Sequence, residues 1–168
     1  RKVLVNGLVP NDEVRCNPCL KPIAMITQNT KCFADLSSEE FLRIHARARG
    51  IKNNNVIDET IELANKFTGE KIRKNSRVTV LSGGQTRSLL VADAILIGAS
   101  PVILLDEIEN AGIFKQEVVR IIQNTGKIIV FVTHDPVIAL LTKKRIIMQN
   151  GAVKKVIIRS DLEVTAAY

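Results

Sequence analysis

Three residues, Ser82, Gly83 and Gly84, have the types and spacing to bind a phosphate. They precede Gln85 and a segment whose apolar positions predict a helix up to Ile97. Adjacent glycines leave backbone N–H groups uncovered by a Cβ atom, and the start of a helix carries positive partial charge. This turn therefore brings together a hydroxyl, accessible amides and positive partial charge, a combination that favours binding of an anion. Taken alone, the same residues also describe a glycine turn with a serine cap.

Two acidic residues end the most apolar strand candidate. Val102–Leu105 is an aliphatic run too short for a helix, which predicts a strand buried on both faces of a parallel sheet. Asp106 and Glu107 follow it directly. In open α/β sheets ligands bind at the carboxyl ends of the strands, so these carboxylates could hold a metal ion or activate water.

Gln28 and His134 stand in equivalent places after other strand candidates. Gln28 follows Ile23–Thr27, and His134 follows a second buried strand, Ile128–Thr133. Each of these residues, like the Asp-Glu pair, has an ordinary reading as part of a solvated turn. Their common position at strand ends is the feature that points to a shared site.

A helical stretch separates the first strand candidate from the glycine turn. Ser37-x-x-Glu40 is a capping box that predicts a helix ending at Gly50, and the apolar periodicity of Val56–Phe67 predicts another. We therefore expect residues 34–80 to form an inserted α-helical subdomain.

The remaining segments, residues 1–33 and 81–168, predict a core of alternating strands and helices. Alternation of this kind favours βαβ units and a mostly parallel sheet flanked by helices. Asn150-Gly151 lies between two apolar segments and predicts a C-terminal β-hairpin. Further expected elements are a strand at Val3–Val5 and a helix around Val118–Ile122. The fold class is thus α/β.

Composition narrows the classes of partner. The 168 residues, 46% hydrophobic and 24% charged, suit one globular domain with a real core. A net charge of +7 suggests a polyanionic neighbour, although the charges are scattered along the chain, and 4% aromatic residues argue against a stacking platform for single-stranded nucleic acid. No run reaches the roughly 18 apolar residues of a membrane span. We therefore expect a cytoplasmic protein.

Three cysteines occur at positions that resemble neither a disulfide framework nor a complete zinc site. Cys16 and Cys19 form a C-x-x-C pair, with Cys32 downstream. An odd number argues against a disulfide framework, and a zinc site would need a fourth ligand. We expect reduced, unligated thiols.

Together these motifs resemble the nucleotide-binding domain of ATP-binding cassette (ABC) ATPases. LSGGQ is similar to the signature motif, VILLDE to the Walker B motif, MITQN to the Q-loop and FVTHD to the H-loop. Each motif alone is weak, but four in this order, from about Val3 to Val156, are specific. The resemblance implies a P-loop NTPase-like fold that binds ATP and Mg²⁺.

The resemblance also assigns roles to individual residues. It implies that Asp106 holds Mg²⁺, usually through water, and that Glu107 polarises the attacking water. Gln28 would contact the metal and that water, and His134 would donate a hydrogen bond to the γ-phosphate. The residues Ser82, Gly83, Gly84 and Gln85 would complete the ATP site of a second, head-to-tail nucleotide-binding domain.

The sequence departs from the family pattern in two places. The phosphate-binding loop G-x-x-x-x-G-K-S/T is absent, because Gly126-Lys127 is followed by Ile128 and lacks the earlier glycine. In the family this loop precedes the region where this chain begins, so we interpret the chain as lacking the N-terminal part of the domain. The second departure is in the D-loop, where the family has an acidic residue and this sequence has Ile113 near the same place. Whether the two ATP sites of a dimer would be coupled is therefore an open question.

The resulting hypothesis is the ATPase subunit of an ABC transporter. Such a subunit would be peripheral on the cytoplasmic face of the membrane, partnered by a membrane permease and a second nucleotide-binding domain, with no direct nucleic acid expected. The alternatives are a non-catalytic fragment, motivated by the missing loop, and a soluble ABC-type ATPase acting on nucleic acid or ribosomes.

Overall fold

The chain forms two compact units, residues 1–132 and residues 133–168. A computed structural model describes residues 4, 9, 11–27, 29–107 and 112–159. The sequence pattern predicts a different division, in which residues 34–80 form a helical subdomain apart from the ATPase core. That division stays a prediction.

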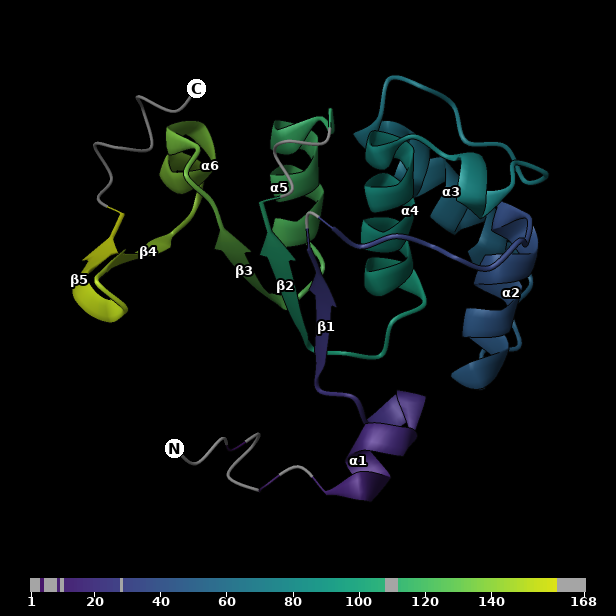
Figure 1. Cartoon of the computed structure of the whole chain (residues 1–168), viewed down its shortest axis with the longest axis horizontal. Coiled ribbons are helices and arrows are strands. Elements are labelled where there is room, and N and C mark those ends of the chain that lie inside the picture. Colours follow the sequence, from purple (N-terminus) through teal and green to yellow (C-terminus); the bar gives the residue numbers. More distant parts are fainter. Residues whose placement is uncertain (1–3, 5–8, 10, 28, 108–111, 160–168) are drawn as a thin grey trace. The chain divides into compact units, whose positions relative to one another are not determined.

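The first unit contains a three-stranded parallel sheet (Figure 1). Its strands are β1 (Ile23–Ile26), β2 (Val102–Asp106) and β3 (Ile128–Val132), in the spatial order β1-β2-β3. β2 (VILLD) is central: Val102–Leu105 pair with β1, and all of β2, including Asp106, pairs with β3. The predicted parallel α/β sheet is confirmed, and each strand lies within one or two residues of its expected bounds.

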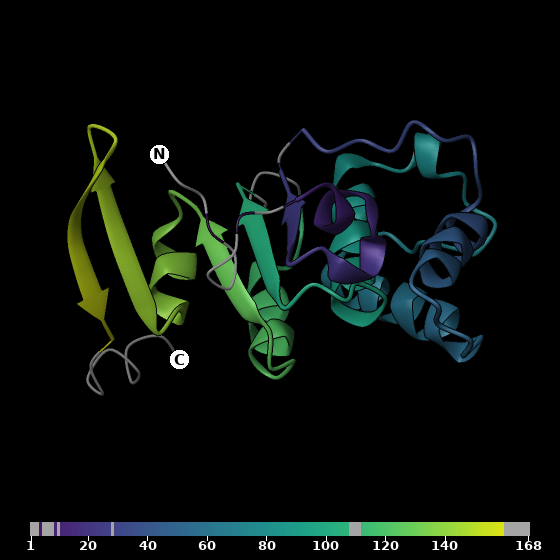
Figure 2. The same ribbon diagram turned by 90° about the horizontal axis from the view of Figure 1, so that it is seen from below.

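One face of this sheet is part of the hydrophobic core. Two helices, α4 (Gly83–Leu96) and α5 (Lys115–Gln123), lie on the same side of the sheet (Figures 1 and 2). Ile103 and Leu105 of β2 are fully buried there, and Phe131 of β3 packs against the same core. Alternate residues of each strand therefore supply the apolar layer beneath the helices.

The opposite face of the sheet is accessible, which corrects the expectation that β2 and β3 are buried on both faces. Along β3, exposed residues alternate with half-buried ones, and Ile128 and Val132 are exposed. β2 alternates half-buried and fully buried residues. An aliphatic run shows that both faces are apolar, but whether both are covered depends on the rest of the fold.

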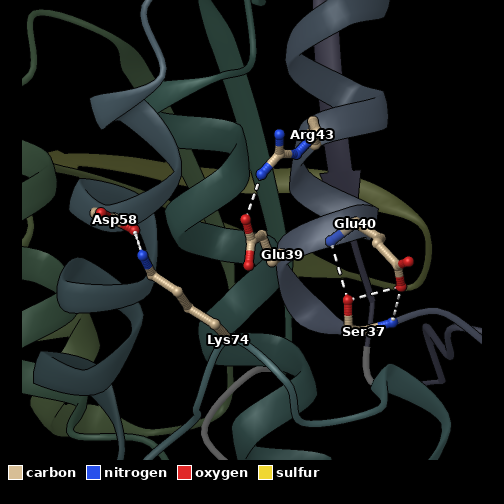
Figure 3. Close-up of polar contacts among 6 residues, drawn as sticks. All are labelled: Ser37, Glu39, Glu40, Arg43, Asp58 and Lys74. Carbon is tan, nitrogen blue, oxygen red and sulfur yellow. Dashed lines mark hydrogen bonds and ion pairs between the residues drawn. The ribbon is translucent and has the colours of Figure 1, made fainter.

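The predicted helical stretch contains α2 (Ser38–Ala48) and α3 (Asn55–Phe67). The capping box of α2 is present: Glu40 N donates to Ser37 Oγ at 3.2 Å, and Ser37 N donates to Glu40 Oε2 at 2.9 Å (Figure 3). Val56, Ile61, Ala64 and Phe67 are among the residues that α3 buries in the core. Both helices follow the periodicity of the sequence.

The loop between α3 and α4 is held by polar contacts, which fixes the approach to the glycine turn. Asn65 makes two hydrogen bonds with the backbone of Ile72, at 2.7 and 3.0 Å. Lys74 Nζ lies 2.6 Å from a carboxylate oxygen of Asp58, and Arg43 forms an ion pair with Glu39 (Figure 3). The exposed pairs add little stability, whereas the two Asn65 bonds satisfy a backbone donor and acceptor.

Two short helical elements near the start of the described chain are not predicted by the sequence pattern. They are α1 (Asp12–Cys16), capped by the Asn11 side chain, and the 3₁₀ turn η1 (Pro18–Leu20). Asn11 accepts from Val14 N at 3.0 Å. The strand expected at Val3–Val5 lies outside the described residues apart from Leu4.

The second unit contains α6 (Pro136–Leu141) and an antiparallel hairpin of β4 (Lys144–Gln149) and β5 (Ala152–Ile158). Asn150 and Gly151, at φ +50° and +75°, form the turn. Both values lie in the left-handed region that Asn and Gly tolerate best. The predicted Asn-Gly hairpin is confirmed.

Candidate functional site

The glycine turn is built as the capped N-terminus of α4. Ser82 Oγ accepts a hydrogen bond from Gln85 N at 3.3 Å, and Gln85 Oε1 accepts one from Ser82 N at 2.9 Å. Ser82 and Gly83 are exposed, whereas Thr86, one turn further on, is buried. A helix of this length with exposed amides at its start can bind an anion, and the hydroxyl that accepts from Gln85 still carries a proton to donate.

Gln85 has a second structural connection. Its Nε2 donates to the backbone carbonyls of Glu70 and Lys71, at 3.5 and 3.4 Å. The side chain thus joins the start of α4 to the preceding loop, while its amide oxygen caps the helix. We infer that Gln85 orients the turn, and that Ser82 and Gly83 present its exposed surface.

Asp106 and Glu107 end β2 at the carboxyl edge of the sheet. Asp106 pairs with Val132 of β3, and Glu107 N donates to the carbonyl of Val132 at 2.9 Å. Glu107 has φ +46°, in the left-handed region that a non-glycine residue rarely adopts. Strained backbone of this kind is concentrated at functional sites, so this conformation supports a functional role for Glu107.

The glycine turn and the acid pair lie at the same end of the first unit. Only residues 97–101 join α4 to β2, so the helix runs antiparallel to the strand. Its N-terminus therefore lies at the end where the parallel strands have their carboxyl ends (Figure 1). The first unit therefore has a helix N-terminus of the kind that can hold an anion and two carboxylates on one side.

Two predicted site residues cannot be related to this pair. His134 is exposed and belongs to the second unit, where it follows the end of β3 by two residues. Asp135, its neighbour, caps α6 by accepting from Val137 N at 2.8 Å. Gln28 lies outside the described residues. The joint role of all four site groups stays a prediction.

The chemistry of the donor set fits a hydrated Mg²⁺ better than a metal held by the protein alone. Among the described residues, no group of three or more His, Cys, Asp or Glu side chains could enclose a metal ion. Asp106 and Glu107 supply two half-buried carboxylates at adjacent positions. Mg²⁺ is commonly bound through one or two carboxylates, with water and substrate phosphates as its other ligands.

Lys127, which follows Gly126 in the sequence, caps a helix in this structure. Its Nζ donates to the carbonyls of Ala94 and Gly98, at 2.8 and 2.6 Å. Burial, and secondarily the charge of Arg49, lowers the pKa of the Lys127 ammonium. The Lys127 side chain therefore satisfies carbonyls at the C-terminal end of α4 and has a structural role in this unit.

The first unit also contains a polar pair that the sequence pattern does not predict. His45 Nδ1 of α2 lies 2.9 Å from Asp93 Oδ2 of α4, and Asp93 is buried. The signal available in the sequence was an aspartate inside the otherwise apolar run of the helix, which needs a partner when it is buried. His45 was not paired with it because the two residues are far apart in sequence.

The chain is similar to ATP-binding subunits of transporters. It is 50% identical over 163 residues to an uncharacterized ABC transporter ATP-binding protein of Methanocaldococcus jannaschii, a match covering 97% of this chain and 62% of the relative. It is 29% identical over 154 residues to the macrolide export ATP-binding/permease protein MacB of Campylobacter jejuni, covering 85% of this chain and 23% of MacB. The chain thus spans less than two thirds of these curated relatives. No protein-family model matches it.

Solved structures share its fold. A dimeric, post-hydrolysis ATP-binding cassette bound to ADP and Pi aligns with a TM-score of 0.72 at 22% identity, covering 90% of this chain and 68% of the other. An ATP-binding subunit of an ABC transporter aligns with a TM-score of 0.70 at 18% identity, covering 98% and 70%. At these identities the likeness establishes the architecture of the chain.

Proposed function

We propose that the chain, which carries motifs that resemble those of ABC ATPases and is 50% identical to an ABC transporter ATP-binding protein, is the ATP-binding part of a transporter. In this proposal, ATP binding and hydrolysis at a head-to-tail dimer interface drive transport by a membrane permease. The observation that carries it is that the first unit has, at one end, a capped glycine turn, the carboxylate of Asp106 and the neighbouring Glu107 with its left-handed backbone. The 50% sequence identity to the ABC transporter ATP-binding protein of M. jannaschii also supports a transporter function.

The proposed hydrolytic chemistry is centred on the acid pair. Asp106 would hold Mg²⁺ through water, and the ion would neutralise charge on the transferring phosphate. Glu107 would accept a hydrogen bond from the attacking water and so orient it. Its backbone, fixed by the bond to Val132, limits where this carboxylate can lie. His134 would donate to the γ-phosphate, and Gln28 would contact the metal and the attacking water.

The glycine turn would act on the nucleotide of a second copy or of a related domain. Ser82 and Gly83 are exposed at the start of α4, where a second domain could reach them. ATP bound to one domain would then be covered by this turn of the other. A second nucleotide-binding domain is therefore part of the proposed site.

The chain cannot by itself supply every phosphate contact of the proposed site. Its sequence contains no G-x-x-x-x-G-K-S/T loop, and the Gly126-Lys127 pair is used to cap α4. Backbone amides and a lysine for the β- and γ-phosphates would come from polypeptide equivalent to the part of the relative outside the match. No helix within the described ranges is both long and apolar enough to cross a bilayer. Association with the membrane would occur through the permease.

A hybrid protein tests this function. In it, this chain replaces the matched part of the M. jannaschii relative, and ATP hydrolysis and dimerisation are measured. We expect Glu107→Gln to abolish hydrolysis and to trap an ATP-bound dimer, because the amide cannot orient the water as a carboxylate does. The control is Glu117→Gln, which makes the same change on the exposed surface of α5. Hydrolysis by Glu107→Gln equal to that of the control would refute the assignment.

The same hybrid distinguishes the alternatives. A non-catalytic fragment would give a hybrid that hydrolyses no ATP even with Glu107 intact, and the Glu107→Gln variant of that hybrid would form no ATP-dependent dimer. A soluble ABC-type ATPase acting on nucleic acid would show hydrolysis stimulated by DNA or RNA, with binding that weakens steeply as salt increases. Stimulation by a reconstituted permease instead would support the transporter.

A further inference from the structure

The guanidinium of Arg87 lies beside Gly83 at the start of α4. A Cβ atom at Gly83 would be 3.0 Å from Arg87 Nη1 and 4.0 Å from Arg87 Cζ, so the guanidinium lies next to the bare Cα of the glycine. Side chains of a helix lean toward its N-terminus, and residues four apart share a face, which brings Arg87 back over the first turn. The glycine therefore accommodates a cation as well as leaving its amide accessible.

This position adds a charged donor to the glycine turn. Ser82 and Gly83 are exposed there, and Arg87 is half-buried. The side chain of Gln85 is already engaged, because its oxygen caps the helix and its Nε2 donates to carbonyls of the preceding loop. The Ser82 hydroxyl, the first amides of α4 and the Arg87 guanidinium thus lie within one turn of each other.

The charge of Arg87 has the sign that a helix disfavours at its N-terminus. The macrodipole is positive at this end, so a cation there is unfavourable and an anion is favourable. The first turns of α2 and α3 include the acidic residues Glu40 and Asp58, whereas the first turn of α4 contains no acidic residue. A guanidinium beside Gly83 makes the local potential more positive, which favours an anion with several charges.

We propose that Arg87 donates hydrogen bonds to the phosphates of a nucleotide held by a second nucleotide-binding domain, next to the Ser82 hydroxyl and the Gly83 amide. The inference rests on the proposed function, because it adds a residue to the site that two domains would share. A guanidinium presents parallel N–H donors that match two phosphate oxygens, and such charge-assisted bonds are stronger than neutral ones. Arg87 would therefore strengthen the ATP-dependent contact between the two domains.

The ATP dependence of dimerisation in the hybrid protein tests the proposal. All variants also carry Glu107→Gln, so that bound ATP is not consumed, and the ATP concentration at half-maximal dimerisation is measured. We expect Arg87→Gln to raise this concentration about tenfold or more. Arg87→Lys should raise it less, because the lysine keeps the charge. The control Arg120→Gln removes an exposed arginine from α5 and should leave the concentration unchanged.

Two results would overturn the proposal. An Arg87→Gln midpoint equal to that of Arg120→Gln would show that Arg87 does not contact the nucleotide. Equal increases for Arg87→Gln and Arg87→Lys would show that the charge does not act on it.

Chemical denaturation of each variant checks that it folds. If Arg87→Gln does not, Gly83→Ala is combined with Arg87→Lys, because a Cβ at Gly83 would displace the guanidinium. A smaller effect of Gly83→Ala in the lysine variant supports the contact, and additive effects contradict it. A Glu107→Gln hybrid that forms no ATP-dependent dimer would refute the proposed function and this inference with it. A normal dimer that Arg87→Gln leaves unaffected would refute the inference alone.

Discussion

His45 Nδ1 lies 2.9 Å from Asp93 Oδ2, and this contact joins α2 to the helix that follows the glycine turn. The Asp93 side chain is 9% exposed, and the His45 side chain is 32% exposed. The second oxygen of Asp93, Oδ1, is buried and has no hydrogen-bond partner within the part of the chain that the structure describes. The carboxylate therefore depends heavily on His45.

Removing His45 should cost more than a usual surface substitution. His45→Ala leaves a buried carboxylate without its histidine, for which we expect a loss of about 1–3 kcal/mol in the free energy of unfolding. Chemical denaturation measures it, with Arg47→Ala on the same helix as the exposed control. In a double-mutant cycle, Asp93→Leu should remove most of the penalty of His45→Ala. Additive effects of the two substitutions would show that the pair is not coupled.

Comparing the two serine caps distinguishes the structural role of Ser82 from its proposed role in binding nucleotide. Ser37 and Ser82 each open a capping box, one on α2 and the other on α4. We expect Ser37→Ala and Ser82→Ala to lower the free energy of unfolding by a similar amount, about 1 kcal/mol. In the hybrid protein, only Ser82→Ala should weaken the ATP-dependent dimer. If both variants formed the ATP-dependent dimer equally well, the role of Ser82 would be only to cap α4.

The capping box of α2 also predicts a pH dependence. Hydrogen bonds from the Ser37 side chain and backbone lower the pKa of Glu40 in the folded protein. The folded state therefore releases this proton more readily than the unfolded state. The stabilisation is present above the unfolded pKa, about 4.3, and is lost as the pH falls through the lower folded pKa.

Thermal unfolding of the wild type and Glu40→Gln checks this prediction. The glutamine keeps an oxygen acceptor but does not titrate in this range, so Tm should fall less steeply below about pH 4.3 in the variant. Glu62→Gln on α3 is the matched control, because it removes an exposed carboxylate from a helix without a capping box. Parallel curves for the wild type and Glu40→Gln would contradict the role of the cap.

Local structure was predictable where the signal lies within a few neighbouring residues. The Ser37-x-x-Glu40 box, the Asn150-Gly151 turn and the aliphatic run before Asp106 each specify their element through short-range sterics and hydrogen bonds. For the same reason, the order of the strands and of helices α2 to α5 followed from the sequence, whereas α1, η1 and α6 were not predicted.

Burial and strain depend on distant partners and were not predictable. The residues of β3 are as apolar as those of a fully covered strand, yet Ile128 and Val132 are exposed because no helix of the first unit packs on that face. Glu107 has a left-handed conformation and donates its backbone N–H to Val132 of the neighbouring strand, a contact that the sequence alone does not reveal. Likewise, Lys127 resembled part of a phosphate-binding loop, and only the fold shows it capping α4.

In the proposed dimer, Ser82 of one copy and Glu107 of another complete a single ATP site. Complementation between two inactive hybrid proteins tests it directly, because a head-to-tail dimer of Ser82→Arg with Glu107→Gln contains one site with both residues intact. We expect each variant alone to hydrolyse no ATP and their mixture to regain hydrolysis. A mixture as inactive as its separate components, although mixed dimers form, would contradict the shared site.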